Sequence, residues 1–287
     1  MAQTTNSGTA ASAGTVAGAA RSDAVSFAVI ASTIIPVVPD PAQFASFYDD
    51  AYSQPPGQAE VYSRWRALGA AGKADHVIGL CRSASVVPAS TLEIGCGDGA
   101  LLSELHRRGF GGQLSGVEIS EAAVRIARQR HEIESVEVYD GQHLPADDGG
   151  YELAILSHVL EHVADPPALL REAARVSRAI VVEVPLEANW SARRTGKRAQ
   201  AVEVGHLQRL DRGAVRALVA RAGLVTAAEL QDALPLAAQR FFATSRPAQL
   251  AAAAKWSVRV AVNRLAPPLA RRLFTVHYAC LCLQPDG

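Results

Sequence analysis

The sequence has no excess of charge of either sign and little lysine. Its 287 residues carry 28 basic and 28 acidic side chains, so the formal net charge is zero. A nucleic-acid-binding protein normally carries a basic excess, so this balance argues against general nucleic-acid binding. Lysine occurs only at positions 73, 197 and 255. The preference for arginine and alanine is typical of a GC-rich, bacterial genome.

Cysteine is scarce, and long hydrophobic runs are missing. The four cysteines, at positions 81, 96, 280 and 282, form no C-x-x-C pair, which indicates reduced thiols rather than a disulfide framework. The longest weakly polar run, residues 24–38, contains Pro36 and is too short to span a bilayer. The first charge is Arg21, so the start lacks the basic end of a signal peptide. We therefore expect a cytoplasmic protein.

Composition divides the chain into a tail and one α/β domain, residues 23–287. Residues 1–22 are small and low in complexity, which predicts a disordered tail. Residues 23–41 favour a strand-like segment. Helical spacing of apolar residues on both sides of a Pro-Pro-Gly break predicts an N-terminal helical cap over residues 42–83. The segments that follow are a core at 88–232, a basic helical insert at 233–275 and a last strand at 276–283.

Strands and helices alternate throughout the core. Apolar runs predict strands at residues 90–95, 113–119, 135–139, 151–157, 179–184 and 224–230. Helical periodicity predicts helices at residues 99–108, 121–130, 166–177 and 211–222, while residues 185–210 are expected as a loop. Repeated strand–helix units of this length predict a parallel sheet with helices on both faces, which is a Rossmann-like arrangement.

Three glycines mark the turn between the first strand and the first helix of the core. In the run TLEIGCGDG, residues 91–99, Gly95, Gly97 and Gly99 let the backbone bend sharply and approach a ligand. Such a ligand would meet free N–H groups at the start of the helix. With Ala100, the run also fits the relaxed dinucleotide fingerprint. A tight turn without a ligand is the remaining interpretation.

Acidic residues stand at the ends of the neighbouring strands. Glu93 precedes the first glycine by two positions, Glu118 ends the second strand, and Asp140-Gly141 follows the third. A carboxylate at the end of the second strand can accept hydrogen bonds from both hydroxyls of a ribose. These strand ends meet at one edge of a parallel sheet, where α/β folds bind ligands.

With these motifs, residues 88–232 resemble the class I S-adenosylmethionine-dependent methyltransferases, in the branch that includes ubiquinone, menaquinone and natural-product methyltransferases. The segments Leu160–Pro166 and Gly205–Asp211 are similar to later motifs of that family. The resemblance implies a seven-stranded, mostly parallel sheet whose last strand runs antiparallel. It further implies that S-adenosylmethionine is held by Glu93, Gly95, Gly97 and Gly99 at its methionine part, by Glu118 at the ribose, by Asp140 with Gly141 at the adenine and by Ser157 at the amino end.

Three histidines are candidates for contact with the methyl acceptor. The sulfonium of this cofactor already activates the methyl group, but a hydroxyl acceptor gains from a general base. His158 and His206 are the catalytic candidates, with roles in the pocket wall or in loop organisation as the alternatives. His162 is expected to pack or hydrogen-bond. His158 and His162 also fit the inverted zinc-peptidase pattern H-x-x-E-H, but His158 is expected at a strand–helix junction, so we predict no metal site.

The insert is strongly basic. Residues 233–285 contain seven basic residues and no acidic one, and Lys255, Arg259 and Asn263 form a polar stripe on an otherwise apolar segment. This pattern predicts a helix that acts as a lid or a dimer surface. The alternative is contact of residues 248–272 with an anionic membrane. A second basic cluster is either a solvated surface or a site for an anionic substrate group: Arg193, Arg194, Lys197 and Arg198, beside Trp190.

Together these features predict methyl transfer from S-adenosylmethionine to a small-molecule acceptor, with oxygen favoured because of the histidines. A membrane-held quinone or lipid acceptor is an alternative, as is a partner protein that binds the cofactor without catalysis. A nicotinamide oxidoreductase also stays open, and a homodimer is one further possibility. Aromatic residues of the helical cap either line the acceptor pocket or pack in the core: Tyr48, Tyr52, Tyr62 and Trp65.

Overall fold

The computed structural model describes residues 41–233 and 235–285. All of them belong to the second of the two units of the chain, residues 35–287. The predicted tail at residues 1–22 and residues 23–40 of the predicted strand-like segment lie outside the described residues.

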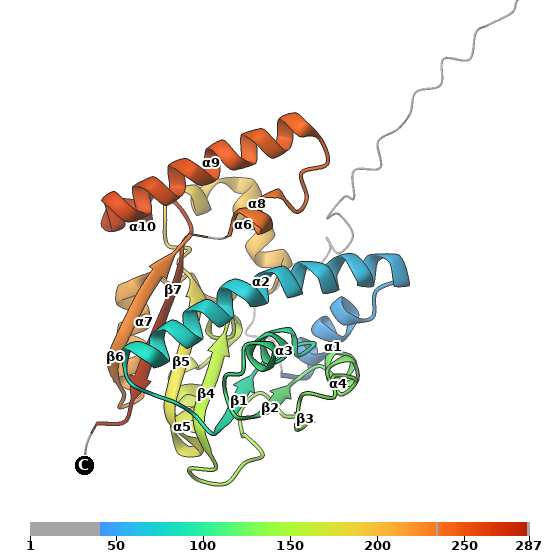
Figure 1. The fold of residues 1–287 in the computed structure, drawn as a ribbon, viewed down its shortest axis with the longest axis vertical. Coiled ribbons are helices and arrows are strands. Elements are labelled where there is room, and N and C mark those ends of the chain that lie inside the picture. The colour runs from blue at the N-terminus through green and yellow to red at the C-terminus, as the bar shows by residue number, and fades with distance from the viewer. Residues whose placement is uncertain (1–40, 234, 286–287) are drawn as a thin grey trace, which may run out of the picture. The chain divides into compact units, whose positions relative to one another are not determined.

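Seven strands form one sheet of order β3-β2-β1-β4-β5-β7-β6 (Figure 1). The strand β7 runs antiparallel to both β5 and β6, and the other neighbours are parallel. The predicted seven-stranded, mostly parallel sheet is therefore confirmed. The bounds are β1 Ser90–Ile94, β2 Gln113–Glu118, β3 Ser135–Val138, β4 Tyr151–Ser157, β5 Ser177–Pro185, β6 Val225–Asp232 and β7 His277–Leu283.

Helices cover both faces of this sheet. Successive residues of a strand point to opposite faces. Ile180 and Val182 of β5 accordingly belong to the core cluster under α5 and α7, whereas Ala179 and Val181 belong to the cluster under α2, α3 and α4. The α-helices of this sandwich are α2 Pro56–Ser83, α3 Ala100–Arg107, α4 Glu121–Ala127, α5 Pro166–Val176 and α7 Arg212–Arg221, and α1 Pro41–Tyr52 contacts α4.

The expected loop at residues 185–210 is partly helical, which corrects the sequence prediction. A 3-10 turn, η2 Ser191–Arg193, precedes the helix α6 Thr195–Glu203. Asn189 starts the turn because its side chain accepts a hydrogen bond from the N–H of Ala192 and donates one to the carbonyl of Leu186. Residues with polar side chains near a turn can satisfy backbone groups in this way, and the apolar pattern carried no sign of it.

The basic insert forms a short helix, α8 Leu236–Arg240, and a hairpin of α9 Arg246–Leu265 and α10 Pro267–Leu273, which are separated by Ala266. The orientation of α9 differs from that expected of an amphipathic helix packed through its apolar residues. Asn263 is buried beside Gln231, and the Arg259 guanidinium lies 5.3 Å from the ring centroid of Phe274. Apolar side chains point outward instead, with Leu250 69%, Val258 58% and Leu265 86% exposed.

None of the helices in the described part of the chain is both long enough and apolar enough to span a bilayer.

Candidate active site

A cavity of about 1070 Å³ opens at the carboxyl ends of the parallel strands. Parallel sheets bind ligands at this edge because the loops that follow the strands meet there. Most of the predicted site residues line it: Glu93, Gly95, Gly97, Glu118, Asp140, Gly141, Ser157 and His158. Gly99 and His206 are not among the lining residues. The structure thus brings together residues that lie up to 65 positions apart in the sequence.

The glycine loop after β1 has a left-handed backbone. The φ angles are 72° at Gly95, 54° at Gly97 and 74° at Gly99, a region that side chains with a Cβ atom rarely adopt. A Cβ atom on Gly97 would lie 2.4 Å from the hydroxyl of Tyr52. Glycine is therefore required both for the turn and for the close approach of α1, whose last residue covers the loop.

Glu118 connects the end of β2 to the glycine loop. One carboxylate oxygen accepts a hydrogen bond from the N–H of Gly97 at 2.8 Å, and the other accepts from Ile119 and Ser120 at 2.8 and 3.1 Å. Burial raises the pKa of Glu118, and these backbone donors act in the opposite direction because they stabilise the carboxylate. The side chain also lines the cavity, so it has a structural task in addition to the ribose contact predicted for it.

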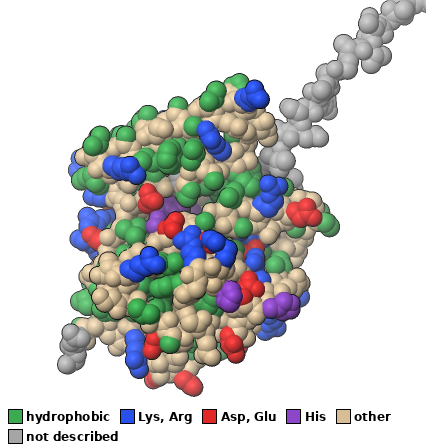
Figure 2. Space-filling model, in the orientation of Figure 1, with side chains coloured by type: hydrophobic (Ala, Val, Ile, Leu, Met, Phe, Trp, Pro, Cys, Tyr) green, Lys and Arg blue, Asp and Glu red, His purple; other side chains and the backbone are tan. Residues whose placement is uncertain are grey.

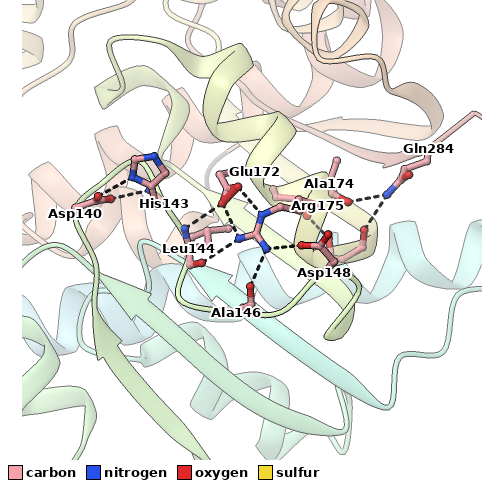
Figure 3. Close-up of polar contacts among 11 residues, drawn as sticks. Asp140, His143, Leu144, Ala146, Asp148, Glu172, Ala174, Arg175 and Gln284 are labelled. Carbon is pink, nitrogen blue, oxygen red and sulfur yellow. Dashed lines mark hydrogen bonds and ion pairs between the residues drawn. The ribbon is translucent and has the colours of Figure 1, made fainter.

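Asp140 caps the loop that follows β3. One carboxylate oxygen accepts from the N–H groups of Gln142 and His143, and the other lies 2.9 Å from His143 Nδ1 (Figure 3). Burial acts to raise the pKa of Asp140, but these hydrogen bonds outweigh it and lower the pKa to about 2. The carboxylate is therefore ionised at neutral pH and is held at the rim of the cavity.

The same loop is held by Arg175 of α5 (Figure 3). Its guanidinium donates to the carbonyls of Leu144 and Ala146 and to the carboxylates of Asp148 and Glu172. A planar guanidinium with five N–H groups suits several acceptors at once. The position of the predicted adenine contact thus depends on a residue that the sequence reasoning did not single out.

Glu93 is a buried carboxylate with one unpartnered oxygen. It is 4% exposed, and its Oε2 atom has no hydrogen-bond partner in the structure. Burial disfavours the charged form and raises the pKa of Glu93 to about 8. A buried acid that faces a cavity in this state is suited to a cationic ligand group, because such a group would restore its charge and supply the missing hydrogen bond.

His158 lies at the end of β4 between two carboxylates. Its backbone is left-handed, with φ 61°, which is rare outside glycine and stores strain. Its Nδ1 lies 3.2 Å from Glu161 Oε1, and its Nε2 lies 3.7 Å from Glu183 Oε1. Burial and Lys73 act to lower the pKa of His158, but the two carboxylates outweigh them and raise it.

Glu183 of β5 is the centre of a histidine cluster that the sequence reasoning missed. The residue is 0% exposed. Its Oε1 atom lies 3.3 Å from His76 Nδ1 of α2 and 3.1 Å from His277 Nδ1 of β7, in addition to His158. A buried charge is costly without partners, so a glutamate inside the apolar run of residues 179–186 was the signal that could have pointed to this cluster.

His206 is engaged outside the cavity. Its Nδ1 lies 2.8 Å from Glu187 Oε2, and its ring packs on His162 with centroids 4.7 Å apart. Nδ1 of His162 lies 2.8 Å from the hydroxyl of Tyr48 and 3.1 Å from the carbonyl oxygen of Gly205. These contacts join α1, η1 Leu160–His162 and the segment before α7. They favour the loop-organising role for His206 and the hydrogen-bonding role for His162.

The aromatic residues of the helical cap were expected either to line the pocket or to pack in the core, and they differ in which of these they do. Tyr48, Tyr52 and Trp65 line the cavity, whereas Tyr62 does not. Trp65 also packs against Phe241 and Phe242, with ring centroids 5.5 and 5.2 Å apart. The basic insert therefore closes one side of the cavity through its first residues.

Comparison with known proteins agrees with this geometry. The family model described as a methyltransferase domain matches residues 70–229, more than half of the chain. The chain therefore belongs to the methyltransferase-domain family. This match confirms the predicted class of S-adenosylmethionine-dependent methyltransferase and the predicted cofactor.

Curated relatives match only part of the chain. A ubiquinone biosynthesis O-methyltransferase of Thiobacillus denitrificans is 33% identical over 91 residues, which are 30% of this chain and 38% of that protein. The Acinetobacter baylyi protein of the same name is 29% identical over 28% of this chain and 35% of its own length. An uncharacterized 37.1 kDa protein in a Streptomyces fradiae transposon is 40% identical over 31% of this chain and 27% of its own length. The chain thus spans well under half of these relatives.

Solved structures share the fold at low sequence identity. A Thermotoga maritima S-adenosylmethionine-dependent methyltransferase, described as a possible histamine N-methyltransferase, aligns with a TM-score of 0.54 at 15% identity, over 84% of this chain and 99% of that chain. Geranyl diphosphate C-methyltransferase from Streptomyces coelicolor aligns with a TM-score of 0.53 at 16% identity, over 75% and 80%. Because the acceptors named for these proteins differ, the shared fold carries no information on the acceptor.

The unpartnered state of Glu93 predicts a pH-dependent stability. The pKa of Glu93 is about 8 in the folded protein, above the value for an exposed glutamate in the unfolded chain. Between these two pKa values the folded state binds more protons than the unfolded state, so the free energy of unfolding falls as pH rises toward 8. Glutamine does not ionise, so Glu93→Gln removes this loss of stability at high pH. The variant should melt within a degree or so of the parent at about pH 5 and about 3–10 °C higher at about pH 9, as expected for about 1–3 kcal/mol.

Thermal unfolding of the cofactor-free protein, followed by circular dichroism at both pH values, measures this difference. Glu121→Gln is the matched control, because the side chain of Glu121 is 72% exposed on α4. An equal melting difference at both pH values would contradict the protonated state of Glu93.

Proposed function

We propose that this protein transfers a methyl group from S-adenosylmethionine to an oxygen atom of a small-molecule acceptor. The observation that carries the proposal is one continuous cavity that joins the glycine loop and the strand-end carboxylates to the histidine cluster. The donor supplies a sulfonium-activated methyl group, whose electron pair stays on sulfur when the group moves to the acceptor oxygen. The hydroxyl proton of the acceptor must leave in the same reaction.

The cofactor half of the cavity fits the donor. The orphaned Oε2 atom of Glu93 offers an acceptor for the ammonium group of the methionine part. The left-handed loop at Gly95 and Gly97 leaves room for a ligand to approach the backbone. Glu118 and Asp140 lie farther along the same edge, in the order that ribose and adenine require. Ser157, at the end of β4, is proposed to offer its backbone to the amino end.

The acceptor half of the cavity favours a hydroxyl group. His158 and His277 both line it, and Nε2 of His158 has no hydrogen-bond partner. Such a nitrogen can accept a hydrogen bond from a hydroxyl and help to remove its proton. We therefore assign the acceptor contact to His158, and we assign the organisation of the neighbouring loop to His206.

The first test is calorimetric titration with S-adenosylhomocysteine, with NADH as the control ligand. One saturable site for S-adenosylhomocysteine and none for NADH is expected. Glu118→Ala should weaken this binding by about 1–3 kcal/mol, the usual cost of a lost charge-assisted contact. Because Glu118 also holds Gly97, the melting temperature is measured in parallel. A folded variant with unchanged affinity would contradict the ribose assignment, and no binding by the folded parent would contradict the proposal.

The second test separates the two histidines. His158→Ala should lower methyl transfer by about 10²–10⁴-fold, the range typical of a lost proton-transfer group, while S-adenosylhomocysteine binding is retained. His206→Ala should lower it by less, because His206 does not line the cavity. Release of S-adenosylhomocysteine is measured with 3,4-dihydroxybenzoate and other phenolic acceptors. Equal losses in both variants would argue against His158 as the acceptor contact, and no turnover of any acceptor would favour the partner-protein alternative.

A membrane-held quinone or lipid acceptor is the second candidate, and the surface of the α9–α10 hairpin favours it. Leu250, Val258, Leu265 and Leu269 are exposed there. Lys255 and Arg264 are exposed on the same helix. Figure 2 shows hydrophobic and basic side chains side by side at the top of the molecule, where α9 lies. Apolar residues interspersed with arginine and lysine are typical of helices that lie on anionic membranes.

Vesicle co-sedimentation tests this candidate. The protein should bind vesicles that contain phosphatidylglycerol more strongly than vesicles of phosphatidylcholine alone. Lys255→Glu with Arg264→Glu should reduce the binding more than tenfold, since each basic residue near the surface contributes about 1 kcal/mol. Lys197→Glu with Arg198→Glu is the control of equal charge, on exposed residues of α6. The candidate fails if the parent stays in solution or if both double variants behave alike.

A further inference from the structure

We propose that His158, Glu183 and His277 form a binding site for a divalent transition-metal ion, such as zinc, at the floor of the cavity. One ligand atom from each residue lies within 4.8 Å of the others. The three residues come from the end of β4, from β5 and from the first residue of β7, which are neighbours in the sheet. Two imidazoles and one carboxylate are a donor set that suits such ions.

The distances fit a shared ion. Two ligand atoms that are each about 2.1 Å from one metal ion lie about 3.0–3.4 Å apart at octahedral to tetrahedral angles. Glu183 Oε1 lies 3.1 Å from His277 Nδ1 and 3.7 Å from His158 Nε2. The first distance, which is that of a hydrogen bond in this structure, already matches, and the second requires a movement of a few tenths of an ångström. The ligand atoms of His158 and His277 lie within 4.8 Å of each other, so these two imidazoles would have to move closer together to share an ion.

Unpartnered buried atoms point to a missing ligand. Nε2 of His158 and Oε2 of Glu183 have no hydrogen-bond partner, and the side chain of Glu183 is 1% exposed. Buried polar groups in native proteins nearly always have a partner. An ion placed among these three residues would supply a partner to Nε2 of His158, and it would supply one to Oε2 of Glu183 where both carboxylate oxygens bind it.

Further carboxylates lie close to the ring nitrogens of the cluster. Glu161 Oε1 lies 3.2 Å from Nδ1 of His158, which leaves Nε2 free to face Glu183. A metal-bound histidine usually donates its other ring N–H to a carboxylate, which fixes the tautomer. Asp232 stands 3.6 Å from Nε2 of His76, whose Nδ1 faces Glu183 from the other side. Glu161 is thus placed to act as the outer partner of one proposed ligand, His158.

The open side of the proposed site faces the acceptor. The side chains of His158 and His277 are 25% and 14% exposed, and both line the cavity. An ion held there would bind the acceptor hydroxyl and lower its pKa, which eases loss of the proton before methyl transfer. With the ion bound, the ion takes the place of the direct contact between Nε2 of His158 and the acceptor, because that nitrogen is then a metal ligand. This role rests on the proposed function, whereas binding of the metal itself does not.

A second cluster, Glu161 with His162 and His206, is a weaker candidate. Nδ1 of His162 already contacts Tyr48 and the carbonyl of Gly205, and Nδ1 of His206 contacts Glu187. The H-x-x-E-H pattern, discounted in the sequence, would have placed an ion between His158 and His162. The proposed site shares only His158 with that pattern.

Titration of the metal-depleted protein with zinc chloride, and with cobalt chloride followed by visible absorption, tests the proposal. One equivalent of each metal should bind, with the d–d absorption of cobalt held by nitrogen and oxygen ligands. His277→Ala and Glu183→Gln should abolish saturable binding. Glu161→Gln should weaken it by about 10–100-fold, as is usual for an outer partner. His206→Ala is the control and should bind as the parent does.

Titration with S-adenosylhomocysteine on the same samples reports the fold and separates the two proposals. If the parent binds S-adenosylhomocysteine but shows no saturable metal binding, the metal site alone is overturned. That result would mean that protons, rather than a metal ion, neutralise the carboxylates of the cluster. Unchanged binding in folded His277→Ala, or loss in His206→Ala, would also overturn the assignment. A parent that binds zinc but not S-adenosylhomocysteine would support the metal site and contradict the proposed function.

Discussion

The burial of carboxylates at the carboxyl edge of the sheet is the constraint on which the site depends. A buried carboxylate is costly unless it finds hydrogen bonds, positive charge or a proton. Three strands meet this demand differently. Glu118 on β2 receives three backbone N–H groups, and Glu183 on β5 is surrounded by imidazoles. Glu93 on β1 has a pKa of about 8 and retains an unpartnered oxygen. The edge therefore holds three different groups. Glu118 fixes a turn, Glu183 lies in a histidine cluster that has unpartnered atoms, and Glu93 has an oxygen without a hydrogen-bond donor.

The antiparallel insertion of β7 makes the cluster around Glu183 possible. Because β7 lies between β5 and β6 and runs against both, its first residue comes to the edge where the parallel strands end. His277 is thereby paired with Pro185, two residues beyond Glu183 on the neighbouring strand. The long helix α2 crosses the same edge and adds Lys73 and His76. A chain with a parallel last strand would place that histidine at the opposite edge of the sheet.

The sequence was sufficient for the parts of the site that are local. Glycines that require a left-handed backbone stand in one short run, so the loop of Gly95 and Gly97 and the neighbouring strand ends were predictable. The cluster was not, because His76 and His277 lie more than 90 positions from Glu183. Their proximity depends on tertiary packing, which no local pattern encodes. The orientation of α9 was missed for a related reason: Asn263 is buried because Gln231 of β6 offers it a hydrogen bond.

The two halves of the cavity therefore differ in the segments of the chain that line them. The cofactor half is built from backbone groups and from the loops after β1, β2 and β3, the last of which is held by Arg175 of α5. The acceptor half joins α2, β5, β7 and the first residues of the insert, including the contact of Trp65 with Phe241 and Phe242. We expect changes in these elements to affect binding of the acceptor more than binding of the cofactor. This separation explains why the fold and the donor follow from the family, whereas the acceptor must be sought in the chemistry of the histidine cluster.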